Sequence, residues 1–370
     1  MDHEARVTGI FVPSQGPKPA ALQDERLTAL PETLSGQRRT GQRFRPTYAA
    51  LDLGTNNCRL LVARPSGNGF RVVDAFSRIV RLGEGVSLTG RIGEAATART
   101  IAALKICRDK MRSCGVTRAR LIATEACRMA ENGTEFCARV ADQVGLDFEI
   151  VDRATEAELA AFGCSPLLDP RSRGAILFDI GGGSSELVRL GPSDNSRGGP
   201  PTPVIEGWIS IPLGVVTLAD RFGGITVTPE TFERMVEAVT SELADFSARH
   251  GGNLVDIHML GTSGTVTTIA GVFLNLMRYD RRKVDGCWLS AEDITGVIAK
   301  LMMMSYDDRA ANPCIGVERA DLVLTGCAIL EAIRRTFPVP RLRVADRGLR
   351  EGMLVQMMRA DGVWDRASEA

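Results

Sequence analysis

The sequence predicts an α/β protein made of two similar domains that face a common cleft. An apolar run, an aspartate, a turn of glycine and hydroxyl or amide residues and a second apolar run occur at residues 48–63 and recur at residues 175–190. A further short apolar run follows each repeat, so both domains are expected to open with three antiparallel strands. The length of 370 residues is too great for one small core and suits two domains of ordinary size.

The repeat at residues 175–190 is predicted to be a phosphate-binding hairpin. Its turn contains three glycines and then two hydroxyl residues: Gly181, Gly182, Gly183, Ser184 and Ser185. Without Cβ atoms the backbone can take positive φ and turn successive N–H groups toward one anion, while the serines add hydroxyl donors. A short alternating strand follows instead of a helix, so a helix dipole is not expected to be the source of binding.

An acid at the start of this turn makes a divalent cation part of the hypothesis. Asp179 would repel a bound phosphate unless a cation lay between them. Mg²⁺ combines carboxylate and phosphate oxygens in this way. We therefore expect a site that depends on Mg²⁺ or another divalent cation.

The earlier repeat is predicted to be the second half of the same site. Asp52 opens its turn, Gly54 follows, and Thr55 and Asn56 take the places of the serines. One glycine-rich turn is as often a plain hairpin as a phosphate loop. Two turns that share the order of strand, aspartate, glycine and hydroxyl indicate two half-sites in one cleft.

The first domain is predicted to continue with alternating helix and strand. The expected strands are residues 48–53, 60–64, 70–77, 120–124 and 148–151, and the expected helix is residues 94–113. Arg128 lies just beyond the carboxyl end of one of these strands, where α/β proteins bind ligands. Its guanidinium could clamp phosphate oxygens, and a surface ion pair is the alternative.

A glutamate in the first turn of the next helix is the candidate base. Thr155 at the N-cap and Glu158 three residues later fit a capping box, which places Glu156 in the first turn. Two interpretations stay open from the residues alone. Glu156 either complements the helix dipole or serves as a general base at a strand end.

The second domain is predicted to repeat this order around a third small turn. A strand at residues 257–260 leads into Gly261, Ser263 and Gly264, which then open a helix; alone, such a turn could be a routine connection. The other expected elements are a strand at 204–211, a long helix behind Thr228, a helix at 291–304 behind Ser290, a helix at 320–336, a strand at 341–345 and a closing helix.

The predicted domain limits follow from these elements and from composition. Residues 1–46 are rich in Pro, Gly, Gln and Arg without a period, so they are expected to be a disordered arm, with an arginine cluster at 38–45. The first domain is expected at residues 47–172 and the second at 173–348. The closing helix, about 349–370, lies beyond these limits and is expected to pack back on the first domain.

Composition excludes several classes of function. The 45 basic and 45 acidic residues give no basic field of the kind a general nucleic-acid binder needs. No apolar run is long enough for a membrane span, and acidic residues near the N-terminus do not suit a signal peptide, so a cytoplasmic location is expected. Three histidines offer few bases for a Ser-His-Asp hydrolase and no zinc-site spacing, which favours a carboxylate base.

Five segments together resemble the exopolyphosphatase / guanosine pentaphosphate phosphatase (Ppx/GppA) family of the actin-like ATPase superfamily. They are LDLGTNN at 51–57, ATEACR at 123–128, DIGGGSSE at 179–186, GTSGT at 261–265 and DRGLREG at 346–352. The resemblance is to the short form, without the helical C-terminal domain of longer members. Sugar kinases share the loops but not this full set.

The resemblance implies two actin-like (ribonuclease H-like) domains with an active-site cleft between them. By this resemblance Glu156 matches the catalytic glutamate and Arg128 the phosphate-clamping arginine. Asp179 and Glu186 match the acids that hold or orient the metal, and the three small turns match the phosphate-binding loops.

The implied activity is hydrolysis of the terminal phosphoanhydride of inorganic polyphosphate. The close alternative is removal of the 5′ γ-phosphate of guanosine pentaphosphate, which uses the same loops. A kinase of the actin-like superfamily and a non-catalytic nucleotide or polyphosphate sensor are further alternatives. The sequence leaves the preferred chain length open, and it leaves open whether the protein forms a homodimer.

Overall fold

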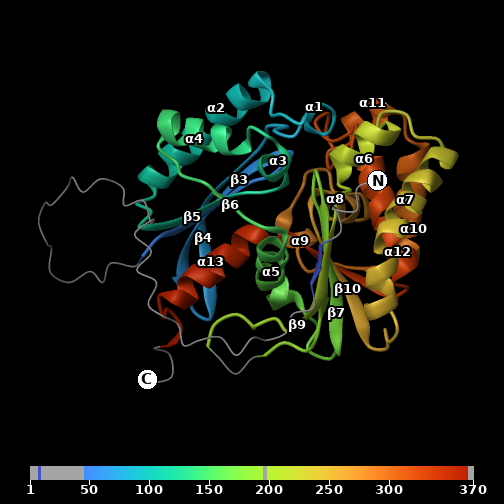
Figure 1. Cartoon of the computed structure of the whole chain (residues 1–370). Helices are drawn as coiled ribbons and strands as arrows, with labels where there is room; N and C mark the ends of the chain where they lie inside the picture. Colours follow the sequence, from blue (N-terminus) through green and yellow to red (C-terminus); the bar gives the residue numbers. More distant parts are fainter. Residues whose placement is uncertain (1–6, 10–45, 195–197, 366–370) are drawn as a thin grey trace, which may run out of the picture.

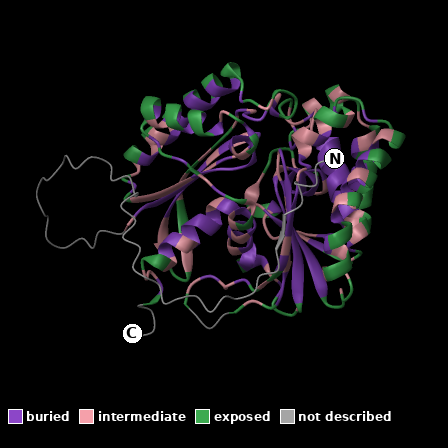
Figure 2. Ribbon diagram, in the orientation of Figure 1, coloured by how far each residue is buried: buried purple, intermediate pink, exposed green. Residues whose placement is uncertain are grey.

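Two β-sheets, each covered by helices on its outer side, are separated by a middle layer of two helices (Figure 1). The structure is a computed structural model and describes residues 7–9, 46–194 and 198–365. The mixed α/β architecture expected from the sequence is confirmed. Figure 2 shows that the strands and the inward faces of the helices form the buried core.

The first sheet has five strands in the order β4-β3-β2-β5-β6. Its strands are β2 (Tyr48–Leu53), β3 (Asn57–Ser66), β4 (Gly69–Ile79), β5 (Arg118–Ala123) and β6 (Glu149–Ile150). The first three strands are antiparallel, and β2, β5 and β6 are parallel. The turn between β2 and β3 therefore lies at the same sheet edge as the carboxyl end of β5.

The second sheet contains the same five-strand order, β9-β8-β7-β10-β12, with β1 and β11 added at its edges. Its strands are β1 (Val7–Gly9), β7 (Gly174–Ile180), β8 (Ser185–Leu190), β9 (Ile205–Ile211), β10 (Ile257–Thr262), β11 (Trp288–Ser290) and β12 (Arg341–Ala345). Strands β7, β8 and β9 are antiparallel, and β7, β10 and β12 are parallel. The predicted duplication is thus confirmed at the level of topology.

Strand β1 departs from the expected disorder of residues 1–46. Val7 pairs with Ser210 and Gly9 with Trp208, so this segment adds an antiparallel edge strand to the second sheet. Three residues are too few to show a strand period in the sequence, which is why the expectation missed it. The rest of the arm up to residue 45, including its arginine cluster, lies outside the described residues.

Helices α2 (Glu94–Ser113) and α4 (Gly133–Val144) cover the outer face of the first sheet, and the short helices α1 (Val86–Thr89) and α3 (Glu125–Met129) lie nearby. The second sheet is covered by α6 (Val215–Phe222), α7 (Pro229–His250), α8 (Gly264–Phe273), α9 (Arg281–Val284), α10 (Ala291–Met303), α11 (Tyr306–Ala311) and α12 (Val323–Thr336). The predicted caps at Thr228 and Ser290 are confirmed, since each side chain accepts a hydrogen bond from a first-turn N–H at 3.1 Å.

The middle layer consists of α5 (Arg153–Cys164), a 3₁₀ turn (Ser165–Leu167) and α13 (Leu349–Ala360). A Cβ on Gly163 would lie 1.9 Å from the Gly348 carbonyl oxygen, and one on Gly352 would lie 2.0 Å from the Leu159 carbonyl oxygen. The two helices therefore pack backbone to backbone, and their core cluster includes residues of both sheets. The closing helix packs against α5 and β2, while the limits 47–172 and 173–348 stay a prediction about folding units.

Helix α5 begins earlier than the sequence suggested. Asp152 is its N-cap, and its carboxylate accepts a hydrogen bond from the Thr155 N–H at 2.7 Å. The expected capping box at Thr155 is therefore wrong, because a second acceptor of the same kind stands three residues upstream. Glu156 still lies in the first turn. Among the described residues, no helix combines the length and apolar character that crossing a membrane requires.

Candidate active site

The two predicted hairpins close with the same backbone hydrogen bond. The Gly54 N–H donates to the Asn57 carbonyl at 2.9 Å, and the Gly181 N–H donates to the Ser184 carbonyl at 3.0 Å. Both turns lie at the ends of antiparallel strand pairs, which confirms hairpins rather than strand-to-helix loops. One N–H of each turn is thus used to hold its shape.

The hairpins touch one another, and this contact explains the glycines. A Cβ on Gly182 would lie 2.9 Å from the Thr55 Cβ, and a Cβ on Gly183 would lie 2.9 Å from both Thr55 Oγ1 and Glu125 Cγ. None of the three glycines of the second turn has positive φ, so that part of the expectation is wrong. Glycine is needed here because two loops approach too closely for any side chain.

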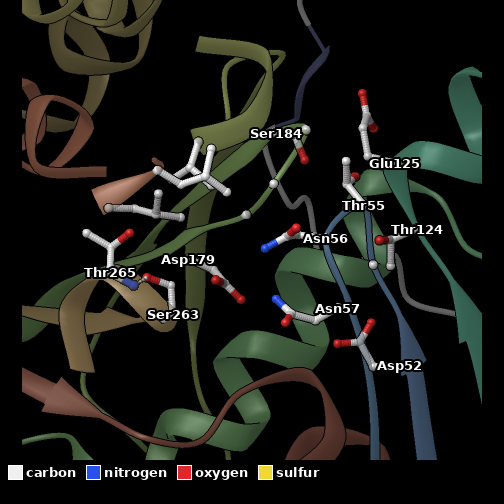
Figure 3. A pocket seen from close by; sticks show the side chains of 18 of the residues that line it. Asp52, Thr55, Asn56, Asn57, Thr124, Glu125, Asp179, Ser184, Ser263 and Thr265 are labelled. Carbon is white, nitrogen blue, oxygen red and sulfur yellow. Dashed lines mark hydrogen bonds between the residues drawn. The ribbon is translucent and has the colours of Figure 1, made fainter. Parts of the chain in front are cut away.

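A cavity of about 120 Å³ lies between the hairpins and the N-terminus of α8 (Figure 3). Thirteen of the predicted site residues line it: Asp52, Gly54, Thr55, Asn56, Glu156, Asp179, Gly181, Gly182, Gly183, Ser184, Glu186, Ser263 and Gly264. In Figure 3 the side chains of Asn56 and Asn57 point across the cavity toward Asp179. The structure therefore brings together segments that lie more than a hundred residues apart in the sequence.

Two other predicted phosphate-binding residues lie outside this lining. The Ser185 hydroxyl is buried and donates to the Leu213 carbonyl at 2.7 Å, because alternation along β8 turns it away from the cavity. Gly261 lies inside β10, where a Cβ would be 2.5 Å from the Phe178 ring. Its glycine serves sheet packing, so neither residue is placed to contact a ligand in this cavity.

Ser263 lines the cavity but is also a helix cap. Its hydroxyl oxygen accepts hydrogen bonds from the N–H groups of Thr265 at 3.2 Å and Val266 at 3.4 Å (dashed line in Figure 3). Its φ of 128° is rare for a residue with a side chain and stores strain at the site. Thr265, which the sequence analysis missed, also lines the cavity.

Five acidic residues line the cavity, and their negative charges repel one another: Asp52, Glu125, Glu156, Asp179 and Glu186. Burial raises the pKa of Asp179 to about 6, and burial raises the pKa of Glu186 to about 7 despite a hydrogen bond from Ser184. The Glu186 carboxylate accepts hydrogen bonds from the hydroxyls of Ser184 at 2.7 Å and Ser210 at 2.8 Å. Burial and the nearby Glu186 charge raise the pKa of Glu156 well above its usual value.

The acids suit a cation held partly by water and substrate. Within the described ranges no three acidic, histidine or cysteine residues lie close enough to form a closed metal cage. Mg²⁺ in phosphate sites takes only one or two carboxylates and completes its shell with water and phosphate oxygens. Asp179 and Glu186 are ladder partners on β7 and β8, so two carboxylates stand beside the turn.

Arg128 does not line this cavity, and most of its donors are already used. Its Nε donates to Glu125 at 2.9 Å, its Nη1 to the Val151 carbonyl at 2.6 Å and its Nη2 to Glu156 at 3.1 Å. The sequence placed Arg128 near the strand end but missed Glu125, whose carboxylate is buried beside it. One N–H of Nη1 has no hydrogen-bond partner among the described residues, and the direct clamp on phosphate stays a prediction.

A second cavity of about 800 Å³ adjoins the first, and five arginines line it. Arg347 is paired with Asp285, and the other four are Arg59, Arg78, Arg319 and Arg350. None of these four guanidiniums forms a hydrogen bond or an ion pair with a residue in the described part of the chain, although Arg78 stacks on the Phe76 ring. Arg59 and Arg319 also line the smaller cavity, so the two spaces are joined.

Only one of these arginines left a signal in the sequence. Arg59 comes seven residues after Asp52, the spacing that separates Glu186 from Asp179, so the internal repeat marks it. Arg319 and Arg350 come from distant segments, and only the fold brings them to the cleft. Sequence patterns within one segment cannot show that residues from distant segments, such as Arg319 and Arg350, lie in the same cavity.

Comparison with known proteins agrees with this geometry. A family model described as the Ppx/GppA phosphatase family matches residues 61–361. A putative exopolyphosphatase of Haemophilus influenzae is 26% identical over 87% of this chain and 95% of its own length. Exopolyphosphatase 2 of Mycobacterium tuberculosis is 28% identical over 84% of this chain and 98% of its own length.

The fold agrees with a solved structure as well. The crystal structure of the Aquifex aeolicus Ppx/GppA family member has a TM-score of 0.71 and 29% identity, over 85% of this chain and 98% of the other. Together with the repeated strand order, this likeness confirms the predicted pair of actin-like domains. The family match over most of the chain means that the protein belongs to the Ppx/GppA phosphatase family.

Proposed function

We propose that the protein is an exopolyphosphatase, which hydrolyses the terminal phosphoanhydride of inorganic polyphosphate and releases orthophosphate. The observation that carries the proposal is the junction of the two cavities. A small, acid-lined space between two glycine-rich hairpins suits one phosphate and a cation, and it opens into a larger space lined by four unpaired arginines. The names of the two curated relatives support the same activity.

In this proposal, different residues bind the substrate and activate the attacking water. The free N–H groups and hydroxyls of the hairpins bind the terminal phosphate, and Arg59 and Arg319 hold the phosphates behind it. Glu156, buried and with a raised pKa, deprotonates or orients the attacking water. This proposal is supported by the presence of Glu156 and of both hairpins in the lining of one small cavity.

Asp179 and Glu186 would hold Mg²⁺. The ion would supply charge neutralisation for the phosphate oxygens, which the five carboxylates of the cavity otherwise repel. Ser184 and Ser210 orient the Glu186 carboxylate for this task.

The direct test is orthophosphate release from chains of defined length. Tripolyphosphate, longer polyphosphates, guanosine pentaphosphate and ATP should be compared at equal concentration, with Mg²⁺ and with chelator. We expect release from polyphosphate, a rise of affinity with chain length until the larger cavity is filled, and loss of activity in chelator. No release from any polyphosphate length would overturn the proposal.

Removal of the γ-phosphate of guanosine pentaphosphate is the second candidate, and one observation favours it. The larger cavity has an apolar wall that includes Pro313, Ile315 and Val317, with Tyr279 beside it. A nucleoside could lie on such a wall. Faster release from guanosine pentaphosphate than from polyphosphate would select this candidate. Phosphorylation of a small molecule by ATP would indicate that the protein is a kinase. Tight polyphosphate binding without turnover would indicate a sensor.

A further inference from the structure

Four charged side chains form a cluster at the wall of the small cavity, and its two glutamates line that cavity. Glu125 and Arg128 come from α3, and Arg153 and Glu156 come from the first turn of α5. All four are largely buried, with side-chain exposures of 7% for Glu125, 17% for Arg128, 14% for Arg153 and 10% for Glu156. Two positive and two negative charges balance the cluster, which is what makes its burial tolerable.

The hydrogen bonds of the cluster are shared unequally between the two glutamates. Glu125 accepts from Arg128 through Oε2 and from Arg153 through Oε1 at 2.9 Å, so both of its oxygens are paired. Glu156 accepts one hydrogen bond, from Arg128 Nη2 at 3.1 Å. Its Oε1 accepts none from a residue that the structure describes, and the side chain lines the cavity.

We propose that Glu125 is a positioning residue for the reaction, which holds Arg128 on Glu156 and away from the substrate. Arg128 is then a positioning residue too, and the phosphates are bound by the hairpins and by the unpaired arginines. This inference deepens the proposed exopolyphosphatase function and rests on it.

Geometry on the other side of Glu125 supports this role. A Cβ on Gly183 would lie 2.9 Å from Glu125 Cγ, so the phosphate-binding turn packs directly on the Glu125 side chain. Arg128 is in addition held by the Val151 carbonyl at 2.6 Å. Moving Arg128 into the cavity would break three hydrogen bonds and leave the Glu125 carboxylate partly unpaired in a buried place.

The surroundings shift the pKa values of Glu125 and Glu156 in opposite directions. Although burial would raise it, the Arg153 and Arg128 guanidiniums hold the pKa of Glu125 below its usual value. The pKa of Glu156 is raised by burial, by Glu186 and by Asp52, and Arg128 alone opposes these effects. Because Glu125 takes most of the hydrogen-bonding capacity of Arg128, Glu156 keeps the basicity that a general base needs.

A double-mutant cycle tests the inference. Glu125→Gln, Arg128→Met and the double variant should be assayed with tripolyphosphate and Mg²⁺ across pH. We expect each single variant to lower kcat about tenfold or more with KM changed less than about threefold, and the double variant to be no slower than Arg128→Met alone. A KM that rises in step with the loss of kcat/KM in Arg128→Met would show that Arg128 binds phosphate and would overturn the inference.

The pH profiles give a signature that a purely structural role would not produce. Glu125→Gln leaves Arg128 to pair with Glu156 alone, so the acidic limb of kcat/KM should move to lower pH. Arg128→Met removes the only cation on Glu156, so the limb should move to higher pH, and the double variant should follow Arg128→Met. Glu131→Gln, which removes an exposed glutamate that pairs with Arg91 close to α3, is the matched control and should leave the profile in place.

Failure of the proposed function would be distinguishable from failure of this inference. If the wild-type protein releases no orthophosphate, the exopolyphosphatase proposal falls, while the cluster is still tested by the pKa of Glu156 read by NMR in glutamate-labelled protein. The two single variants should shift that pKa in opposite directions. Equal shifts, or none, would overturn the positioning role of Glu125 whatever the substrate.

Discussion

Arg59 and Glu186 occupy equivalent positions in the two hairpins, and each lies directly across the strand ladder from the aspartate of its own repeat. Arg59 is the ladder partner of Asp52, and Glu186 is the ladder partner of Asp179. The duplicated frame therefore carries opposite charges at one matched position. The first half-site gains a cation suited to phosphate, and the second gains a pair of acids suited to Mg²⁺.

Arg59→Gln should weaken substrate binding. The Arg59 guanidinium lines both cavities and forms no hydrogen bond or ion pair with a residue that the structure describes, so a charge-assisted bond to phosphate would be lost. Such bonds contribute about 1.5 to 3 kcal/mol, and KM for polyphosphate should rise roughly tenfold or more. Arg71→Gln, on the exposed face of β4, removes the same charge away from the cleft. If both variants raise KM alike, Arg59 has no specific role.

The local parts of the site could be predicted from the sequence. The two hairpins are contiguous segments whose alternation and turn residues are visible in the chain, and both the strands and their common cleft are found where expected. Because the repeat occurs in both halves of the chain, the sequence also predicted that both domains open with three antiparallel strands. Features that depend on a few neighbouring residues could therefore be predicted from the sequence.

The parts that depend on packing could not be predicted. Glu125 was missed because its importance comes from Arg153, 28 residues away, and Arg350 because only the fold turns it toward Arg59. The positive φ expected at Gly181–Gly183 was wrong. Gly182 and Gly183 are constrained by the approach of Thr55 from the other hairpin, and Gly181 by the Ser184 carbonyl. Each error concerns a contact between segments that local patterns do not encode.

Glu156→Gln should separate a structural from a catalytic role. If the carboxylate activates water, kcat should fall by about 10² to 10⁴, with little change in melting temperature or substrate affinity. If it only complements the dipole of α5, stability should drop by about 0.3 to 1 kcal/mol and turnover should persist. Glu158→Gln is the control, because its carboxylate lies on the same helix and bonds Gln356 instead of facing the cavity. A folded Glu156→Gln variant with normal turnover would refute the role of Glu156 as the general base.

Stability should fall in mild acid because of His258. Burial lowers the pKa of His258 to about 4, with Asp169 opposing and Arg343 and Arg341 adding to the effect. In the unfolded chain the pKa is about 6.5, so below that pH the unfolded state binds the extra proton and gains free energy. The loss should be absent above pH 7 and reach about 2 kcal/mol at pH 5, of about 3 kcal/mol in all.

His258→Asn isolates this contribution from that of buried carboxyl groups such as Asp179 and Glu186, whose pKa values are raised and whose effect on stability has the opposite sign. The free energy of unfolding in urea should be measured for both proteins between pH 5 and 8. The difference between wild type and variant should shrink by about 2 kcal/mol as pH falls to 5. A constant difference would mean that the histidine does not titrate as its burial requires.

Asp179→Asn should make the metal-free protein more stable and less responsive to Mg²⁺. Asp179 stands in a cavity with four other acids, and burial disfavours its charge, so removing that charge relieves repulsion when no cation is bound. Mg²⁺ at ten times its dissociation constant should stabilise the wild type by about 1.4 kcal/mol, because it binds only the folded state. The variant, which lacks one of the two proposed ligands, should gain much less, so the two melting temperatures should converge or cross as Mg²⁺ is added.

Asp142→Asn, on the exposed side of α4, should leave both the metal-free stability and the Mg²⁺ response unchanged. An Asp179→Asn protein that Mg²⁺ stabilises as strongly as the wild type would place the cation elsewhere.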